Sequence, residues 1–96
     1  MDIEEIIENF EFLDDWEERY RYVIDLGRSL QGLDDQDKTE ENRVQGCVSN
    51  VWMVWELESQ TPPVLSFRAD SDAHIVRGLV SILLAAFSHK TPDQIL

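Results

Sequence analysis

The spacing of apolar residues changes twice along this chain, and that change limits the fold more than any other feature. Over residues 3–30 they recur every three or four positions, which predicts two amphipathic helices. Over residues 49–58 they alternate, and residues 64–68 repeat the alternation after two prolines, which predicts an antiparallel hairpin. Residues 72–88 are apolar around most of a helical circumference, so a buried helix is expected. This order of elements predicts an α+β domain.

Capping residues mark the expected helix ends. Asp2 precedes the first helix, and Asp14 or Asp15 starts the second. Gly27 falls on the buried face of that second helix, where it permits close backbone approach, and Gly32 suits a left-handed cap at its end.

Three adjacent polar residues, Asp70, Ser71 and Asp72, are candidate N-caps for the late helix, with a functional surface role as the alternative. Thr91, followed by Pro92, opens one further helix.

The sheet is expected to gain a third strand from residues 43–45. Large side chains in the first strand of the hairpin are interpreted as core, and an aromatic face that binds a partner is the alternative. These residues are Trp52, Met53 and Trp55.

Length and charge exclude several classes of protein. Ninety-six residues form one domain, 1–96, and 20 acids against eight bases give a net charge of −12. Residues 1–42 alone hold 15 acids and four bases. Such a chain repels nucleic acid and anionic membranes and favours basic protein surfaces. The apolar run of residues 78–87 is too short to cross a bilayer, and acids follow Met1 where a secretory signal has bases, so a cytoplasmic protein is expected.

The ligand-type residues are too few for a metal site, since Cys47, His74 and His89 are the only cysteine and histidines. Both histidines have plain structural interpretations, His74 in a first helical turn and His89 near a helix end.

Cys47 is unpaired, which fits a reducing compartment. A lone cysteine is usually a small buried hydrophobe. Here, however, it follows Gly46 and has polar neighbours, which is more typical of a loop tip. Attack by sulfur needs the thiolate, and Arg43 is the nearest basic residue in sequence. A partner is therefore expected to supply much of the activating positive charge.

The segment around this cysteine resembles the N-x-V-x-G-C-x-S-x-V-W signature of the SufE family, the sulfur acceptors of iron-sulfur cluster assembly. The matching residues are Asn42, Val44, Gly46, Cys47, Ser49, Val51 and Trp52. Residues 16–20 with 24–27, residues 70–79 and residues 90–92 resemble further blocks of the family in the same order.

The resemblance implies an α+β fold with two N-terminal helices, a three-stranded antiparallel sheet and C-terminal helices packed on one face. It implies that Cys47 accepts sulfur, that Gly46 and Ser49 shape its loop, and that Asp72 and His74 belong to the neighbouring helix start. Arg43 joins them as a residue expected to shape the loop or meet the partner.

The implied function is a sulfur carrier that takes persulfide sulfur from a cysteine desulfurase, stimulates it, and passes the sulfur to a cluster scaffold. Such a chain is an accessory protein with a participating cysteine rather than a stand-alone enzyme. It needs no cofactor or metal of its own, although the desulfurase uses pyridoxal phosphate. The alternative is an acidic adaptor that activates a desulfurase without carrying sulfur.

Family members continue beyond the point that residue 96 matches, so the chain is expected to lack C-terminal helices of the parent protein. The helix at residues 72–88 should then leave an apolar patch exposed. Through this patch the chain is expected to form a homodimer or to bind a hydrophobic dye.

Overall fold

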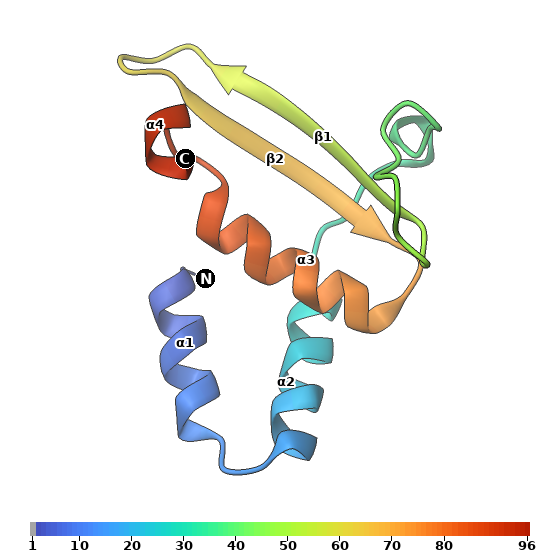
Figure 1. Ribbon diagram of the computed structural model, residues 1–96, viewed down its shortest axis with the longest axis vertical. Helices are drawn as coiled ribbons and strands as arrows, with labels where there is room; N and C mark the ends of the chain where they lie inside the picture. The colour runs from blue at the N-terminus through green and yellow to red at the C-terminus, as the bar shows by residue number, and fades with distance from the viewer. Residues whose placement is uncertain (1) are drawn as a thin grey trace.

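Residues 2–96 are described by a computed structural model with four α-helices, one short 3₁₀ turn and two strands. In chain order these are α1 (Ile3–Phe12), α2 (Trp16–Arg28), η1 (Asp35–Asp37), β1 (Val51–Glu58), β2 (Val64–Ser71), α3 (His74–Phe87) and α4 (Pro92–Ile95). Helix α3 lies between the β1–β2 hairpin on one side and the helical hairpin α1–α2 on the other (Figure 1). The predicted α+β class is confirmed.

The predicted start signals of three helices are confirmed. The carboxylate of Asp2 accepts the amide of Glu5 at the start of α1, and that of Asp15 accepts the amide of Glu18 at the start of α2. Thr91 and Gln94 form a reciprocal capping box at α4.

The predicted third strand is wrong, because the sheet of the described residues has two strands, β1 and β2. Arg43 forms only an isolated bridge to Trp52, flanked by a bond from the Val44 amide to the Val51 carbonyl (2.8 Å). The chain then turns away at Gly46, which has a φ of +85°. Pairing stops there because a continuing strand would need extended backbone at that position.

Helix α2 ends at Arg28 and not near Gly32 as predicted. Arg77 of α3 explains the early end, since its guanidinium donates to the carbonyls of Gly27 (3.3 Å) and Leu30 (2.8 Å). These bonds give partners to carbonyls at and just beyond the C-terminus of α2, where the helical hydrogen bonds end.

The expectation that Asp70, Ser71 and Asp72 cap the late helix is also wrong. Asp70 and Ser71 end β2, and the N-cap of α3 is Ala73, with no side-chain cap. The strand continues to Ser71 because each of its residues pairs with β1 up to Val51.

The core is small and lies between the sheet and α3. Val51, Ala69 and Val80 form its buried cluster, and half-buried side chains pack against it: Leu30, Val44, Val76 and Leu84. Trp55, interpreted as core, is 65% exposed, and Met53 is 37% exposed. Among the elements of residues 2–96, α3 makes the main helical contact with the sheet, and it packs mainly on β2. Leu79, 50% exposed, and Leu83 leave α3 less buried than its sequence predicts.

Candidate functional site around Cys47

The single cysteine lies in a loop of residues 45–50 that projects from the start of β1. The loop is closed at its base by the hydrogen bond from Val44 to Val51, and Cys47 is free and exposed. Val48 beside it is fully exposed. The interpretation of Cys47 as a buried hydrophobe is therefore wrong, and the loop-tip interpretation is confirmed.

Gly46 gives this loop its turn. Its φ of +85° lies in the left-handed region, and no atom would contact a Cβ placed there. Backbone conformation rather than space therefore favours glycine immediately before the cysteine.

Asn50 ties the end of the loop to the junction of β2 and α3. Its amide and its side-chain Nδ2 donate to the carboxylate of Asp72 at 3.2 and 2.9 Å. Its carbonyl accepts from the Ser71 hydroxyl (2.7 Å) and the Asp72 amide (3.3 Å). Four bonds between two short segments hold this end of the loop in place.

Arg43 occupies the other end of the loop, where Glu40 holds its guanidinium. Nε donates to both carboxylate oxygens of Glu40 (3.1 and 3.2 Å), and Nη2 donates to Oε1 (3.0 Å). The hydrogen bond and charge of Arg43 lower the pKa of Glu40. The same hydrogen bond and the charge of Glu40 raise the pKa of Arg43.

A buried carboxylate, Asp70, connects this region to the helices. It accepts the amides of Leu33 (3.1 Å) and Ser71 (2.8 Å) and forms ion pairs with Lys38 (3.3 Å) and Arg77. Burial by itself would raise the pKa of Asp70, but these donors and cations together lower it.

The structure therefore joins some of the predicted site residues to the cysteine loop and leaves one apart. Asp72 is bonded to the loop, and Gly46 and half-buried Ser49 lie within it. His74 is the first residue of α3 and is exposed, and no hydrogen bond or ion pair joins it to the loop in residues 2–96.

Two contributors, Asn50 and Glu40, were not among the predicted site residues. The register of the hairpin could have indicated Asn50, because β1 and β2 pair Val51 with Ser71 and Trp52 with Asp70. Continuing that register by one residue places Asn50 opposite Asp72.

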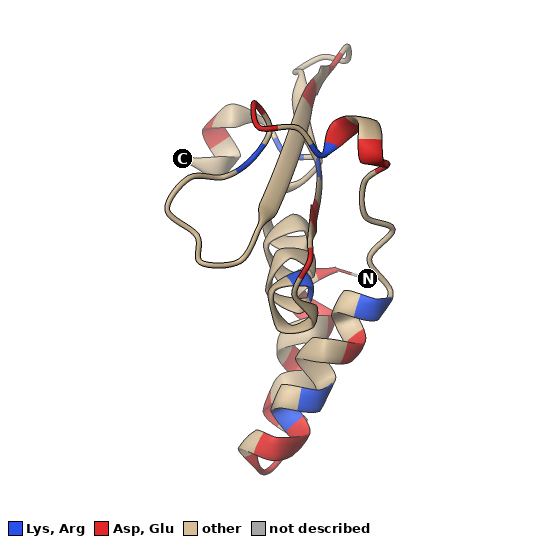
Figure 2. Ribbon diagram, turned by 90° about the vertical axis from the view of Figure 1, so that its right-hand side faces the viewer, with Lys and Arg blue, Asp and Glu red and all other residues tan. Residues whose placement is uncertain are grey.

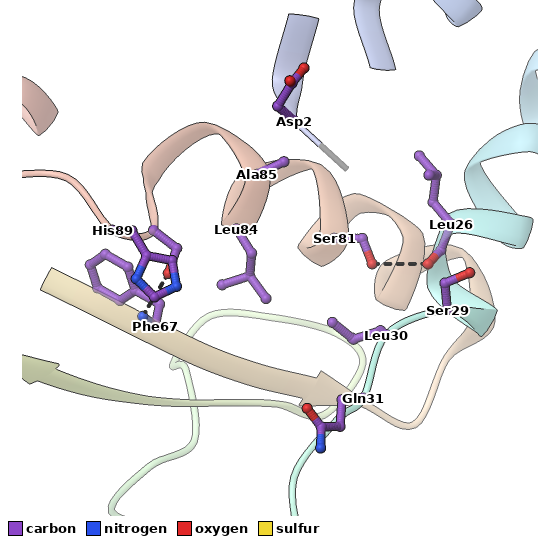
Figure 3. A pocket seen from close by; sticks show the side chains of 11 residues that line it. Asp2, Leu26, Ser29, Leu30, Gln31, Phe67, Ser81, Leu84, Ala85 and His89 are labelled. Carbon is purple, nitrogen blue, oxygen red and sulfur yellow. Dashed lines mark hydrogen bonds between the residues drawn. The ribbon is translucent and has the colours of Figure 1, made fainter. Parts of the chain in front are cut away.

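A cavity of about 620 Å³ lies away from the cysteine loop. Figure 3 shows its walls, formed by the end of α2, by α3 and by Phe67 of β2. The Ser81 hydroxyl that lines it already bonds to the carbonyls of Leu26 and Arg77. No residue of the Cys47 loop lines this cavity, so the cavity is not beside the thiol.

Acidic side chains lie along α1, α2 and η1, whereas α3 carries none (Figure 2).

Within residues 2–96, no group of three or more histidine, cysteine or acidic side chains is arranged to hold a metal ion. None of the helices in that range is both long and apolar enough to cross a membrane.

The fold and the site together define a small α+β domain with one exposed thiol on an anchored loop. The family model described as SufE, Fe-S metabolism associated domain, matches residues 4–96. An uncharacterized SufE-like protein of Rhizobium etli is 52% identical over 94 residues, and one of Rhizobium meliloti is 51% identical over 94 residues. The chain therefore belongs to the SufE family, which is associated with iron-sulfur metabolism.

The matches cover 97% of this chain in both cases. They cover 64% of the Rhizobium etli protein and 67% of the Rhizobium meliloti protein. The chain thus spans about two thirds of the length of these relatives.

Proposed function

We propose that this chain is a sulfur carrier whose Cys47 accepts sulfane sulfur from a cysteine desulfurase and delivers it to iron-sulfur cluster assembly. The observation that carries the proposal is the exposure of Cys47 on a projecting loop, in a chain of the SufE family. A thiol held there can reach the sulfur of another protein, whereas a packed thiol cannot.

The transfer step is a thiol exchange that balances without an oxidant. The Cys47 thiolate attacks the terminal sulfur of the desulfurase persulfide, forming a new S–S bond. The S–S bond of the donor breaks, and its electron pair leaves on the desulfurase thiolate. The sulfane sulfur and its proton, if it carries one, move to Cys47.

The number of soft ligands favours a carrier over a scaffold. Protein-bound iron-sulfur clusters are held by about four cysteines, and this chain has one. We therefore place it between a pyridoxal-phosphate-dependent desulfurase and a separate scaffold complex, with no cofactor of its own. A thiol that must turn over fits a reducing compartment such as the cytoplasm.

The proposal is tested by Cys47→Ser. The chain is incubated with desulfurase and free cysteine, and the mass of the intact protein is measured. We expect the native chain to gain about 32 Da, the mass of one persulfide sulfur. The Cys47→Ser variant should gain nothing, because a hydroxyl is a poor nucleophile toward sulfur. A native chain that gains no sulfur would contradict the proposal.

The acidic adaptor is the second candidate, and the concentration of 15 acids in residues 1–42 favours it. It predicts that Cys47→Ser still accelerates the desulfurase, and that association slows as salt rises because charge steers the encounter. Full stimulation by Cys47→Ser would therefore favour the adaptor over the carrier.

A further inference from the structure

The outer edge of β1, on the side away from β2, is paired over only part of its length. Figure 1 shows β1 on the outside of the hairpin, with β2 between it and α3. Two hydrogen bonds pair its first half, from the Val44 amide to the Val51 carbonyl (2.8 Å) and from the Met53 amide to the Asn42 carbonyl (2.9 Å). The Asn42 amide then donates to the Thr39 carbonyl (3.2 Å), so the chain before Asn42 turns away from β1.

The second half of this edge carries free backbone groups. The bonds of Val51 and Met53 show that their backbone groups point away from β2. Because this direction alternates along an antiparallel strand, the backbone groups of Trp55 and Leu57 point the same way. In residues 2–96, no hydrogen bond joins their amides or carbonyls to another segment. Such a row of unpaired groups can accept a strand from another chain.

One face of this free edge, residues 55–58, is apolar, and the other is acidic. Trp55 and Leu57 share the first face and are 65% and 54% exposed. Glu56 lies on the second face and is exposed, and no ion pair engages it in the described part of the chain. Arg68 is on that face too, but it is paired with Asp37 (3.7 Å).

The charge of the free edge determines which strand fits it. Glu56 and Glu58 lie on it, and residues 51–63 contain no lysine or arginine. A second copy paired there in antiparallel orientation would bring its own acids to the same edge, in a chain with a net charge of −12. Like charges opposite each other destabilise strand pairs, whereas opposite charges stabilise them. Basic side chains are therefore favoured opposite Glu56.

We propose that the free edge of β1 binds an extended segment of a partner protein in which apolar side chains alternate with basic ones. The apolar side chains lie beside Trp55 and Leu57, and a basic one lies opposite Glu56. The bound segment continues the line of residues 42–44 as a third strand. This interaction goes beyond the proposed function and does not depend on sulfur transfer.

The test uses a fluorescein-labelled peptide of about eight residues, the length of an ordinary strand, in which valine alternates with lysine. Fluorescence anisotropy measures its binding to the native chain. One control peptide replaces lysine by glutamate. The other is N-methylated at the valine amides, which removes the donors that would face β1 and keeps the charge. We expect both controls to bind about tenfold more weakly or worse, because each loses cross-strand interactions.

Hydrogen exchange measured by NMR locates the binding site on the native chain. With the valine–lysine peptide at ten times its Kd, exchange of the Trp55 and Leu57 amides should slow about tenfold, because only the free protein exchanges there. The Glu56 amide points toward β2 and should change little.

Two substitutions test the edge and its charge separately. Leu57→Pro removes an amide donor that faces outward, which an edge strand tolerates, and should weaken binding about tenfold. Leu57→Val keeps that donor and is its control. Glu56→Gln should weaken binding about threefold, whereas Glu17→Gln, at an exposed residue of α2, should leave it unchanged.

Binding of the N-methylated peptide as tightly as its parent, or unprotected Trp55 and Leu57 amides in the complex, would overturn the pairing. Both measurements use the native chain, so they decide the proposal even if Leu57→Pro fails to fold. Equal binding of the valine–glutamate peptide would overturn the basic partner. If the two amides are already protected in the chain alone and lose that protection on dilution, a second copy occupies the edge and the proposed occupant is wrong.

Discussion

At the scale of single residues, the position of the Cys47 loop depends on a side chain outside it, that of Asp72. We predict that Asp72→Ala mobilises residues 45–50, since it removes the acceptor for two donors of Asn50. Hydrogen exchange of the loop amides should accelerate, and the free energy of unfolding should fall by about 1 kcal/mol. Asp93→Ala, at an exposed residue of α4, is the control. Unchanged exchange in Asp72→Ala would show that Asn50 does not hold the loop.

Asp70 makes stability depend on pH. Its pKa is lowered from 3.8, so the folded state binds this proton more weakly than the unfolded state. The carboxylate therefore stabilises the fold above about pH 4, and this contribution is lost as the pH falls through the lowered pKa. We expect Asp70→Asn to lower the free energy of unfolding by about 3 kcal/mol at pH 7, because Lys38 and Arg77 lose their buried anionic partner.

The free energies of unfolding of Asp70→Asn and the native chain should differ less at pH 3 than at pH 7, and urea unfolding at both pH values measures this. Asp35→Asn serves as control, because Asp35 is fully exposed and contacts Lys38 at only 4.0 Å. A difference that is the same at pH 7 and pH 3 would contradict the role assigned to the carboxylate charge.

At the scale of elements, two glycines set the distance between α2 and α3, as predicted for Gly27. A Cβ on Gly78 would clash with the Val23 carbonyl oxygen, and one on Gly27 would lie 2.6 Å from the Gly78 amide nitrogen. We predict that Gly78→Ala destabilises the protein by about 2 kcal/mol, because the helices must separate. In an isolated helix, alanine is more favourable than glycine by about 1 kcal/mol. A loss of stability in Gly78→Ala would therefore show that helix packing dominates, and a gain would show that helix propensity does.

Thermal melting followed by circular dichroism measures the effect of Gly78→Ala. Glu8→Ala, in exposed α1 sequence, should leave the melting temperature within a few degrees of the native value. A Gly78→Ala variant that melts higher than the native chain would show that the helices adjust at no net cost.

At the scale of the whole molecule, one side of the domain is apolar and uncovered. Met53 pairs with Ala69, whose side chain is buried against Val80 of α3, so alternate residues of β1 share the face that α3 partly covers. Exposed side chains on β1 and α3 make up the uncovered area: Met53, Trp55, Leu57, Leu79, Leu83 and Phe87. This is the exposed apolar patch that the sequence predicts beside the late helix.

We predict that the chain binds a hydrophobic dye through this patch or self-associates, because exposed apolar areas of this kind favour association. Fluorescence titration and light scattering measure the two outcomes. Trp55→Glu combined with Leu83→Glu should reduce both, whereas Phe12→Glu, at an exposed site on α1, should not.

The longer Rhizobium etli relative offers a second comparison, and it should bind less dye if its additional residues cover the same face. Equal dye binding by the native chain and the double variant would show that the patch is not the binding surface.

The sequence by itself determined the α+β class, the order of the elements and the position of Cys47 in a loop. Each of these follows from local chemistry: the period of apolar side chains, caps such as Asp2 and Asp15, and a glycine before the cysteine. Such signals lie within a few residues of the structure that they specify.

Only the tertiary structure decided that Asp70 is a buried ion-pair partner instead of a cap, that Trp55 is exposed, and that α2 stops at Arg28. Each of these depends on residues far away in sequence. Asp70 accepts the amide of Leu33, and Arg77 donates to the carbonyl of Gly27 in the last turn of α2. A local pattern specifies which residues are apolar or charged, but their burial and pairing depend on which elements the folded chain brings together.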